Sequence, residues 1–410
     1  MTSKIPFSLP YINHSVKMEV NSVLNDTGWL TSGPKVKLFE EEISKLNKVS
    51  NTVCVNSWTS AAMLMLRWFG VGVGDEVIIP SYTYSATALC VLNIGAKPIM
   101  VDVLDDFTID PNEIKEKVNN NTKVIIPVDI GGLPCNYGEI NKIVSCDTVV
   151  SFFRPKSVNQ QKLGRILIIG DAAHSIGATY KRMPIARATD MSLFSFHSVK
   201  NITTGEGGAI SLNLPDDIFD SDEVYNDLKI LSLNGQTKSA FQKNQVGGWR
   251  YDIINQGLKI NMPDICAAIG LAQIKIYSDK LLPERKKIFK FYNEFFSKYD
   301  WALTPPTKDK FRETSYHLYM LRIRGFTEFE RDKLIDTISS KGVAVNVHYI
   351  PMPLLTLFSE LGYKISDYPN TLKLYSNEIS LPVYNNISVD NLRYICKVIL
   401  ESKKIIDEKV

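Results

Sequence analysis

The chain has 410 residues, of which 44% are hydrophobic and 22% are charged, a balance that is ordinary for a soluble globular protein. Its net charge of +3 comes from interspersed acidic and basic residues, which offers no electrostatic basis for binding nucleic acid or a membrane surface. A chain of this length exceeds the size at which one hydrophobic core stops growing, so we expect two domains.

The cysteines are scattered, with neither a Cys-x-x-Cys pair nor a cluster of cysteine and histidine (Cys54, Cys90, Cys135, Cys146, Cys266 and Cys396). This spacing favours reduced, mostly buried thiols and argues against a disulfide framework and against a metal site. The first residues lack the apolar stretch of a signal peptide, and no run reaches membrane-spanning length. We therefore expect a cytoplasmic protein.

Apolar strands alternate with helical patterns through the first part of the chain. A helix is predicted over 34–47, after Gly33, and a strand over 52–55 leads into a helical run over 61–69. The elements predicted next are strands over 76–79, 98–101, 123–128 and 166–169 and helices over 87–93 and 111–118. Such alternation is typical of a doubly wound α/β sheet whose site lies at the carboxyl ends of the strands.

A polar segment over 151–164 interrupts this alternation, and the pattern changes near Gly257. The elements predicted after that point are a long helix over 264–299 with a break near Pro283, strands around 318–321 and 343–347, and a last helix over 389–402. We therefore divide the chain into a large domain over 1–256 and a smaller C-terminal domain over 257–410.

The segment 194–208 contains the most informative residue of the chain, Lys200. It follows an apolar strand and lies on a loop rich in hydroxyl groups and glycine, where the backbone can approach a ligand closely. Asp171 and His174 follow another apolar strand, so two strands bring a carboxylate, an imidazole, an amine and the Ser195 hydroxyl toward one edge of a sheet. A pyridoxal phosphate (PLP) enzyme needs such a set: lysine for the Schiff base, carboxylate for the pyridine nitrogen and hydroxyl for the phosphate.

Each of these residues also has a purely structural explanation. Taken alone, Lys200 is explained as a solvated surface lysine or a phosphate-binding lysine, and Asp171 as a helix N-cap. A lone histidine such as His174 is more often a structural residue with its hydrogen bonds made within the protein than a ligand-binding one. The combination of the three residues, rather than any one of them, favours PLP chemistry.

Residues 56–60 lie between a strand and a helix, so their backbone N–H groups point outward at a helix N-terminus. This is a ready site for phosphate, to which Ser57 and Thr59 add hydroxyl donors, although such residues are usually only helix caps. Residues 80–84 follow the next strand, and one tyrosine there can stack on a pyridine ring; a core aromatic is the alternative. Neither Gly-x-Gly-x-x-Gly after the first strand nor Gly-x-x-x-x-Gly-Lys-Ser/Thr occurs, so dinucleotide and ATP sites lack their phosphate loop.

Together these motifs resemble the DegT/DnrJ/StrS family of PLP-dependent sugar aminotransferases, of fold type I in the aspartate aminotransferase superfamily. The likeness runs almost end to end, through residues 33–34, 56–61, 74–84, 95–98, 171–174, 194–208, 264–271, 315–319 and 347–351. It implies a three-layer α/β/α large domain with a mostly parallel sheet and a smaller C-terminal α+β domain. It also implies a homodimer whose active sites are shared between the subunits.

The resemblance assigns roles to individual residues. By it, Lys200 carries the Schiff base, Asp171 binds the pyridine nitrogen and His174 lies near the phenolic oxygen. Tyr84 stacks on one face of the ring, and Ala173 lies under the other. The remaining implied contacts are Ser57, Trp58, Thr59 and Ser195 with the phosphate, Lys259 of the neighbouring subunit with the same phosphate, and His348 and Tyr349 with the substrate.

Several positions depart from the family pattern. Lys259 stands where asparagine is frequent, and a cation also suits a phosphate dianion. Arg182 and Ala186 stand where glycines are common, and Trp58 replaces a typically small residue. The segment 151–164 is longer than the family norm. Together these departures reshape either the sugar pocket or only a surface loop, and the sequence leaves both alternatives open.

The implied reaction moves an amino group from L-glutamate to a keto carbon of a UDP- or dTDP-linked 4-keto-6-deoxy sugar, for surface polysaccharides such as lipopolysaccharide O-antigen. Glutamate first converts PLP to pyridoxamine phosphate and the sugar then receives the amine, so we expect ping-pong kinetics. The alternatives are a PLP-dependent dehydratase of the family, in which histidine replaces Lys200, and a regulatory homologue without chemistry. Pocket shape rather than motifs decides the nucleotide, GDP included, the aminated carbon and its stereochemistry.

Overall fold

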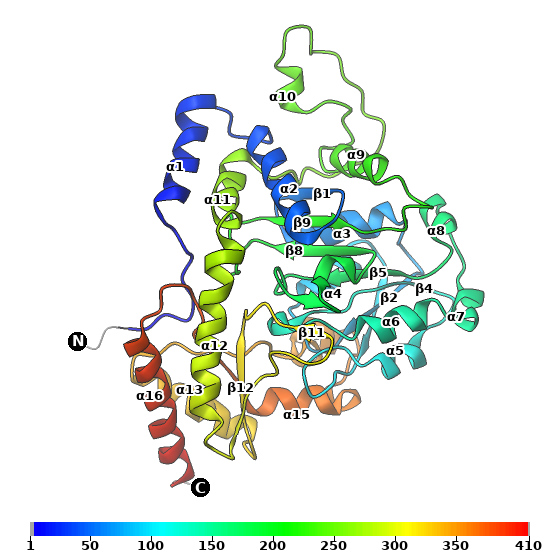
Figure 1. Ribbon diagram of the computed structural model, residues 1–410. Helices are drawn as coiled ribbons and strands as arrows, with labels where there is room; N and C mark the ends of the chain where they lie inside the picture. Colours follow the sequence, from blue (N-terminus) through cyan, green and yellow to red (C-terminus); the bar gives the residue numbers. More distant parts are fainter. Residues whose placement is uncertain (1–3, 409–410) are drawn as a thin grey trace.

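The computed structural model describes residues 4–408 and has at its centre a seven-stranded sheet in the order β1-β9-β8-β5-β4-β2-β3 (Figure 1). Its strands are β1 (Thr52–Val55), β2 (Glu76–Pro80), β3 (Lys97–Val101), β4 (Thr122–Ile125), β5 (Leu167–Asp171), β8 (Met191–Ser195) and β9 (Gly208–Leu212). Every neighbouring pair is parallel except the two pairs made by β9, which runs against both β1 and β8. The mostly parallel α/β sheet expected from the alternating pattern is confirmed.

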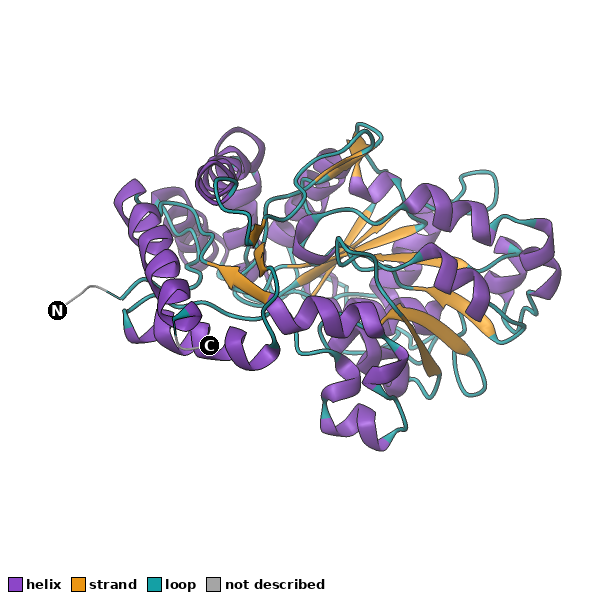
Figure 2. Cartoon of the chain, turned by 90° about the horizontal axis from the view of Figure 1, so that it is seen from below, coloured by secondary structure: helices purple, strands orange, loops and turns teal. Residues whose placement is uncertain are grey.

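Helices cover both faces of this sheet, which gives the three layers expected of the large domain (Figure 2). The helices of this part of the chain are α1 (His14–Ser22), α2 (Pro34–Asn47), α3 (Trp58–Trp68), α4 (Ala86–Asn93), α5 (Pro111–Lys117), α6 (Tyr137–Val144), α7 (Asp147–Phe152), α8 (Val158–Leu163), α9 (Ser221–Leu231) and α10 (Ala240–Lys243). Helix α3 begins three residues before the predicted start because Ser57 caps it, accepting a hydrogen bond from the N–H of Ser60.

The polar segment over 151–164 contains the end of α7 and all of α8. Its Gln160 is fully buried and donates hydrogen bonds to the carbonyl groups of Phe69 and Gly70, at 2.9 and 3.1 Å. The segment is therefore fastened to the C-terminal end of α3. Strand β9 and helix α9 are elements that the sequence pattern did not predict.

In the C-terminal part, α11 (Asp264–Ile274), a π-helical turn (Tyr277–Leu281) and α12 (Leu282–Phe296) follow one another as a long rod (Figure 1). The break in the predicted long helix lies at residues 275–276, before the π-helical turn, and not at Pro283. Pro283 falls in the first turn of α12, where a proline is tolerated because its missing N–H would have had no partner within the helix.

A second sheet, β10-β12-β13, lies beside this rod, and a third small sheet has the order β11-β6-β7. The remaining elements are β6 (Thr179–Tyr180), β7 (Met183–Pro184), β10 (Ala302–Leu303), β11 (Arg312–Glu313), β12 (Tyr319–Ile323), α13 (Glu328–Ser340), α14 (Thr356–Glu360), α15 (Pro369–Asn377), β13 (Glu378–Leu381) and α16 (Val389–Asp407). The strand predicted over 343–347 is wrong. Val343 bridges to Ile5 and Asn346 to Ser380, and two unrelated partners do not make a continuous ladder.

Two large hydrophobic clusters stabilise the two parts of the chain. The first takes its buried residues from 36–281 together with Met352, Phe358 and Tyr368, and the second from Ile5 and 288–406. The division of the chain at residue 257 stays a prediction. Within residues 4–408, no helix combines the length and the apolar character needed to cross a membrane.

Candidate active site

A cavity of about 450 Å³ opens at the carboxyl ends of β5 and β8, beside the N-terminus of α3. Because β5 and β8 are parallel neighbours, with Asp171 opposite Leu193, both strands end at the same edge of the sheet. The predicted site residues that line this cavity are Ser57, Trp58, Thr59, Tyr84, Asp171, Ala173, His174, Ser195, Lys200, His348 and Tyr349. Of the predicted site residues, Lys259 alone is not among those lining it.

Lys200 lies on the loop after β8, where its backbone N–H donates to the carbonyl of His197 at 2.9 Å. Its side chain is half-buried and lines the cavity, and burial lowers the pKa of its amine to about 8 although Asp171 acts to raise it. A lysine with a depressed pKa presents more of the neutral amine, which is the form that attacks an aldehyde. The surface-lysine explanation is therefore excluded.

Asp171 ends β5 and is 4% exposed. Its carboxylate accepts hydrogen bonds from the Thr87 hydroxyl at 3.0 Å and from the N–H of Ala173 at 3.2 Å. Burial raises its pKa to about 7, against the opposing effects of these hydrogen bonds and of the Lys200 charge. Within residues 4–408 it forms no ion pair, so a protonated ring nitrogen would supply the cation that this buried carboxylate lacks.

The N-terminal turn of α3 lines the cavity with Ser57, Trp58 and Thr59. The hydroxyl of Ser57 is occupied by Ser60, because it donates to the Ser60 hydroxyl at 2.9 Å and accepts from the Ser60 N–H at 3.1 Å. The N–H groups of the first helical turn have no partners within a helix, so they are the donors that remain for an anion. Gly208 packs against this turn, where a Cβ atom would come within 2.5 Å of the Ser57 backbone.

Tyr84 is 60% exposed, whereas Tyr82, two residues earlier, is fully buried. The core-aromatic explanation therefore holds for Tyr82 and fails for Tyr84. The ring of Tyr84 lies 5.6 Å from that of Tyr349, and both line the cavity with Ala173. An exposed ring at the edge of a cavity is available for stacking on a planar ligand.

His174 is buried and hydrogen-bonded at both ring nitrogens. Its Nδ1 accepts from the N–H of Gly131 at 3.2 Å, and its Nε2 lies 3.1 Å from the hydroxyl of Tyr349. Burial, together with the nearby charge of Lys200, lowers its pKa well below the ordinary value, which keeps the ring neutral. His348 is also held neutral, because burial lowers its pKa to about 3.

Two residues near the site were not singled out from the sequence. Thr87, on α4, holds the Asp171 carboxylate, and no motif marks it. His317 lies with its ring centroid 4.4 Å from that of His174 and contacts Asn201 through Nδ1 at 2.8 Å. His317 stands inside the segment 315–319 that carried part of the family resemblance, which was the one signal for it.

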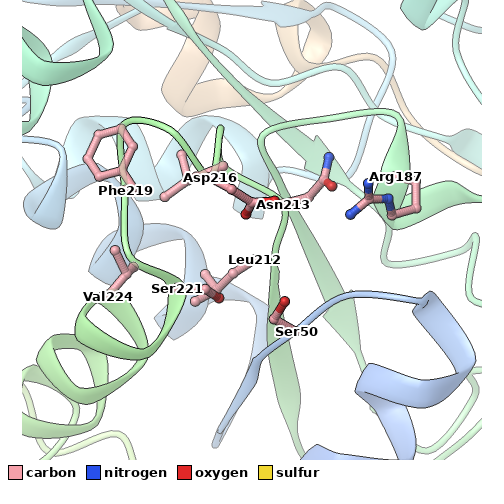
Figure 3. A pocket seen from close by; sticks show the side chains of 9 residues that line it. Ser50, Arg187, Leu212, Asn213, Asp216, Phe219, Ser221 and Val224 are labelled. Carbon is pink, nitrogen blue, oxygen red and sulfur yellow. The ribbon is translucent and has the colours of Figure 1, made fainter.

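Lys259 lies outside the cavity, and its amine donates to the Asn261 side chain at 2.6 Å. A second hollow, lined by residues of β9, of the start of α9 and of nearby loops, lies elsewhere in the large domain (Figure 3). Its volume of about 10 Å³ leaves room for no more than a water molecule, so it does not compete as a ligand site. Within residues 4–408, no three His, Cys, Asp or Glu side chains gather as a set of metal ligands.

A model of the DegT/DnrJ/EryC1/StrS aminotransferase family matches residues 10–152 and 158–400. The chain belongs to this family. It is therefore a PLP-dependent sugar aminotransferase, and the lysine, the unpaired buried aspartate and the open helix N-terminus of the cavity fit that cofactor. The unmatched residues between the two parts fall within the segment 151–164, which the sequence indicated to be longer than the family norm.

Similar proteins of the DegT/DnrJ/EryC1/StrS family cover nearly the whole chain. The spore coat polysaccharide biosynthesis protein SpsC of Bacillus subtilis is 32% identical over 408 residues, which are 98% of this chain and 97% of that protein. A UDP-4-amino-4,6-dideoxy-N-acetyl-beta-L-altrosamine transaminase of Campylobacter jejuni is 29% identical over 372 residues, 89% of each chain. The putative sugar aminotransferase Spr1654 of Streptococcus pneumoniae, solved in its PMP form, is 39% identical with a TM-score of 0.93, covering 98% of this chain and 100% of that one.

Proposed function

We propose that the protein transfers an amino group from L-glutamate to a keto carbon of a UDP- or dTDP-linked 4-keto-6-deoxy sugar. The observation that carries this proposal is the pairing of Lys200 and Asp171 in one cavity, at the ends of two neighbouring parallel strands. Their pKa values are shifted in opposite directions by burial, toward the neutral amine and the neutral acid. The neutral amine can react with an aldehyde of a ligand, and the acid can bind a cationic nitrogen of the same ligand.

When bound, PLP supplies a carbonyl carbon that condenses with amines and a ring that withdraws electrons from the reacting carbon. In our proposal, Lys200 holds the cofactor and, once displaced by substrate, moves the proton between the two reacting carbons. Asp171, which accepts a hydrogen bond from Thr87, keeps the ring nitrogen protonated. His174 faces the phenolic side, and Tyr84 and Ala173 enclose the two faces of the ring.

We assign the phosphate to the first turn of α3, held by the N–H groups of Ser57, Trp58 and Thr59 and by the Ser195 hydroxyl. Ser195 stands at the end of β8 and lines the same cavity. A helix N-terminus attracts an anion both through its free N–H groups and through the helix dipole. His348 and Tyr349 form the wall that we assign to the substrate.

The names of two relatives support a nucleotide-sugar substrate and a role in surface polysaccharide synthesis. The Campylobacter jejuni relative is named for a UDP-linked amino sugar, and the Bacillus subtilis relative for spore coat polysaccharide biosynthesis. We accordingly propose that this protein supplies an amino sugar for a surface glycan such as O-antigen, and that it acts in the cytoplasm. A family dehydratase is disfavoured because position 200 is lysine, not histidine.

We also propose a homodimer with shared active sites and a division into domains at residues 1–256 and 257–410. In favour of the dimer, the segment around α10 projects from the body (Figure 1) and exposes apolar and aromatic side chains, with Trp249 70% exposed. Lys259 follows this segment, does not line the cavity of its own chain and donates to the Asn261 side chain. A second subunit would cover the projecting segment and bring Lys259 to the partner's phosphate.

The test is a spectrophotometric panel on the purified, PLP-loaded protein. L-Glutamate should abolish the absorbance band at roughly 420 nm that marks the lysine-bound cofactor, and a UDP- or dTDP-linked 4-keto-6-deoxy sugar should restore it. Mass spectrometry should then find the sugar with its keto oxygen replaced by an amine. If glutamate bleaches the band and no keto sugar of either nucleotide restores it, the proposed substrate class is wrong.

A further inference from the structure

A chain of contacts runs from the residue beside Lys200 to the substrate-facing wall of the cavity. Asn201 is 5% exposed, and its amide donates to the Tyr277 hydroxyl at 3.2 Å and to the Ser315 carbonyl at 2.9 Å. Its carbonyl oxygen is left to accept from Nδ1 of His317 at 2.8 Å. The His317 ring packs on His174, which contacts Tyr349. Each of these contacts restricts the next, so the position of the Tyr349 hydroxyl depends on a series of buried side chains that begins next to Lys200.

The direction of the last hydrogen bond follows from the tautomer of His174. A backbone N–H can only donate, so Nδ1 of His174, which faces the N–H of Gly131 at 3.2 Å, carries no proton. The ring is neutral, because burial and the Lys200 charge lower its pKa, and its single proton therefore lies on Nε2. The Nε2–H donates to the oxygen of Tyr349 at 3.1 Å. The hydroxyl hydrogen of Tyr349 consequently points away from His174.

This hydrogen is available to a ligand. His174 is the one hydrogen-bond partner of the Tyr349 hydroxyl within residues 4–408, and Tyr349 lines the cavity together with Lys200. Burial and the nearby Asp171 carboxylate raise the pKa of the phenol, so the hydroxyl keeps its proton. The preceding residue is fixed as well, since the N–H of His348 donates to Glu378 at 3.1 Å.

We propose that Tyr349 is a substrate-binding residue whose hydroxyl, oriented by His174, donates a hydrogen bond to an uncharged oxygen on the sugar half of the nucleotide-sugar substrate. This inference rests on the proposed function and deepens it. It assigns to Tyr349 a single direction of hydrogen bonding, so an oxygen at this position is recognised as an acceptor, whether it belongs to a hydroxyl or to a keto group.

The charges of the cavity favour the sugar over the carboxylates of glutamate. The lysine, aspartate and glutamate side chains that line it are Lys200, Asp171 and Glu206. In the proposed function, Lys200 binds the cofactor and is therefore not a partner for a substrate carboxylate. His174 and His348 beside Tyr349 are both held neutral by burial, which lowers their pKa values. A carboxylate against this wall would have no fixed cation, whereas a neutral phenol next to the exposed ring of Tyr84 suits an uncharged sugar oxygen.

The test separates the two half-reactions of the PLP-loaded enzyme and compares wild type with Tyr349→Phe, which keeps the ring and removes the hydroxyl. In the first half-reaction, L-glutamate bleaches the absorbance band; in the second, the UDP- or dTDP-linked keto sugar that the wild type aminates restores it. Tyr349→Phe should carry out the first half-reaction at the wild-type half-saturating concentration. Its half-saturating concentration of keto sugar in the second should rise about three- to tenfold, the effect of one lost hydrogen bond between neutral groups.

Tyr394→Phe is the matched control, because it also removes one tyrosine hydroxyl. This hydroxyl, on the C-terminal helix α16, donates to the Lys341 carbonyl at 3.0 Å and does not line the cavity. It should leave both half-reactions unchanged. Normal bleaching by glutamate also shows that Tyr349→Phe is folded and loaded with cofactor.

The inference is overturned if Tyr349→Phe matches wild type with the keto sugar, or if it weakens both half-reactions alike, since the hydroxyl would then act on the cofactor. Failure of the proposed function would give a different observation. Glutamate would bleach the absorbance band of the wild-type enzyme and no keto sugar would restore it, and that result overturns both the proposed function and this inference.

Discussion

Lys200 and Asp171 are titratable groups of opposite charge whose pKa values are both moved toward the neutral range by burial. The lysine pKa falls from 10.5 to about 8 and the aspartate pKa rises from 3.8 to about 7. The charge of each residue lowers the free-energy cost of burying the charge of the other, yet the two side chains do not form an ion pair at contact distance. In the cofactor-free site the Asp171 carboxylate therefore has no cation in contact, and a ligand with a cationic ring nitrogen would supply one.

The depressed pKa of Lys200 sets the pH dependence of cofactor capture. Because the neutral amine is the nucleophile, the rate constant for PLP uptake by the cofactor-free protein should rise with pH through about 8 and level off above that value. The measurement is stopped-flow absorbance near the imine band over a series of pH values. Lys200→Ala should develop no band at any pH. A rate constant that still climbed at pH 10 would show an unperturbed lysine.

Asp171→Asn should lose activity while keeping the cofactor. An amide does not hold the ring nitrogen protonated, so kcat should fall by about 100-fold or more, whereas the phosphate contacts still retain PLP. Steady-state kinetics and equilibrium dialysis of PLP measure the two quantities. Near-normal kcat in this variant would mean that another residue faces the ring nitrogen.

The same substitution should change the stability of the cofactor-free protein in a pH-dependent way. The folded-state pKa of Asp171, about 7, lies above its unfolded value of 3.8, so its contribution to stability is full below pH 4 and is lost as the pH rises through 7. At pH 8 the fold carries the cost of a buried carboxylate that asparagine does not have. Cofactor-free Asp171→Asn should therefore unfold at a higher temperature than wild type at pH 8, with the gap closing toward pH 5. Equal pH profiles would contradict the burial argument.

At the scale of elements, the hairpin of β6 and β7 has a two-residue turn, Lys181 and Arg182, with φ values of 50° and 66°. Such a turn requires left-handed backbone at both positions, which favours glycine and disfavours residues with a Cβ atom. Both side chains are exposed, although the Lys181 amine lies over the rings of Tyr180 and Phe311, 5.6 and 5.9 Å from their centroids. Arg182 is one of the positions where the family commonly has glycine.

Arg182→Gly should therefore stabilise the protein by about 0.5–1 kcal/mol, because it removes the strain of a Cβ atom at positive φ. The free energy of unfolding in urea is the measurement, and aminotransferase activity should stay unchanged, since the turn does not line the cavity. Arg182→Ala serves as the control, because alanine keeps the Cβ atom and loses only the charged end. Equal stabilisation by alanine would attribute the effect to charge.

At the scale of the whole molecule, the position of Lys259 outside its own cavity bears on assembly. If Lys259 reaches the phosphate of the neighbouring subunit, a heterodimer of Lys200→Ala and Lys259→Ala chains places both lesions in one site and leaves the other intact. That heterodimer should recover about half of the wild-type activity, as site counting at a two-fold interface implies. Activity no higher than that of the Lys259→Ala homodimer would show that the residue serves its own chain. Differently tagged chains and tandem purification give the mixed species.

The sequence by itself determined the elements whose pattern is local. The helix that begins at Pro34, the strands near Pro80 and Asp171 and the alternation that gives a parallel sheet all follow from apolar periodicity. The pairing of Lys200 with Asp171 was predictable too, because parallel neighbours end at one edge.

Only the tertiary structure decided what depends on contacts between distant segments. Residues 343–347 have the composition of a strand, but the chain there bridges to Ile5 and Ser380 in turn, so no ladder forms. Thr87 acts on Asp171, and His317 on His174, across more than 80 residues of chain, and no local pattern encodes such a contact. Burial likewise arises from the whole fold, and it is burial that moves the pKa values of the two central groups.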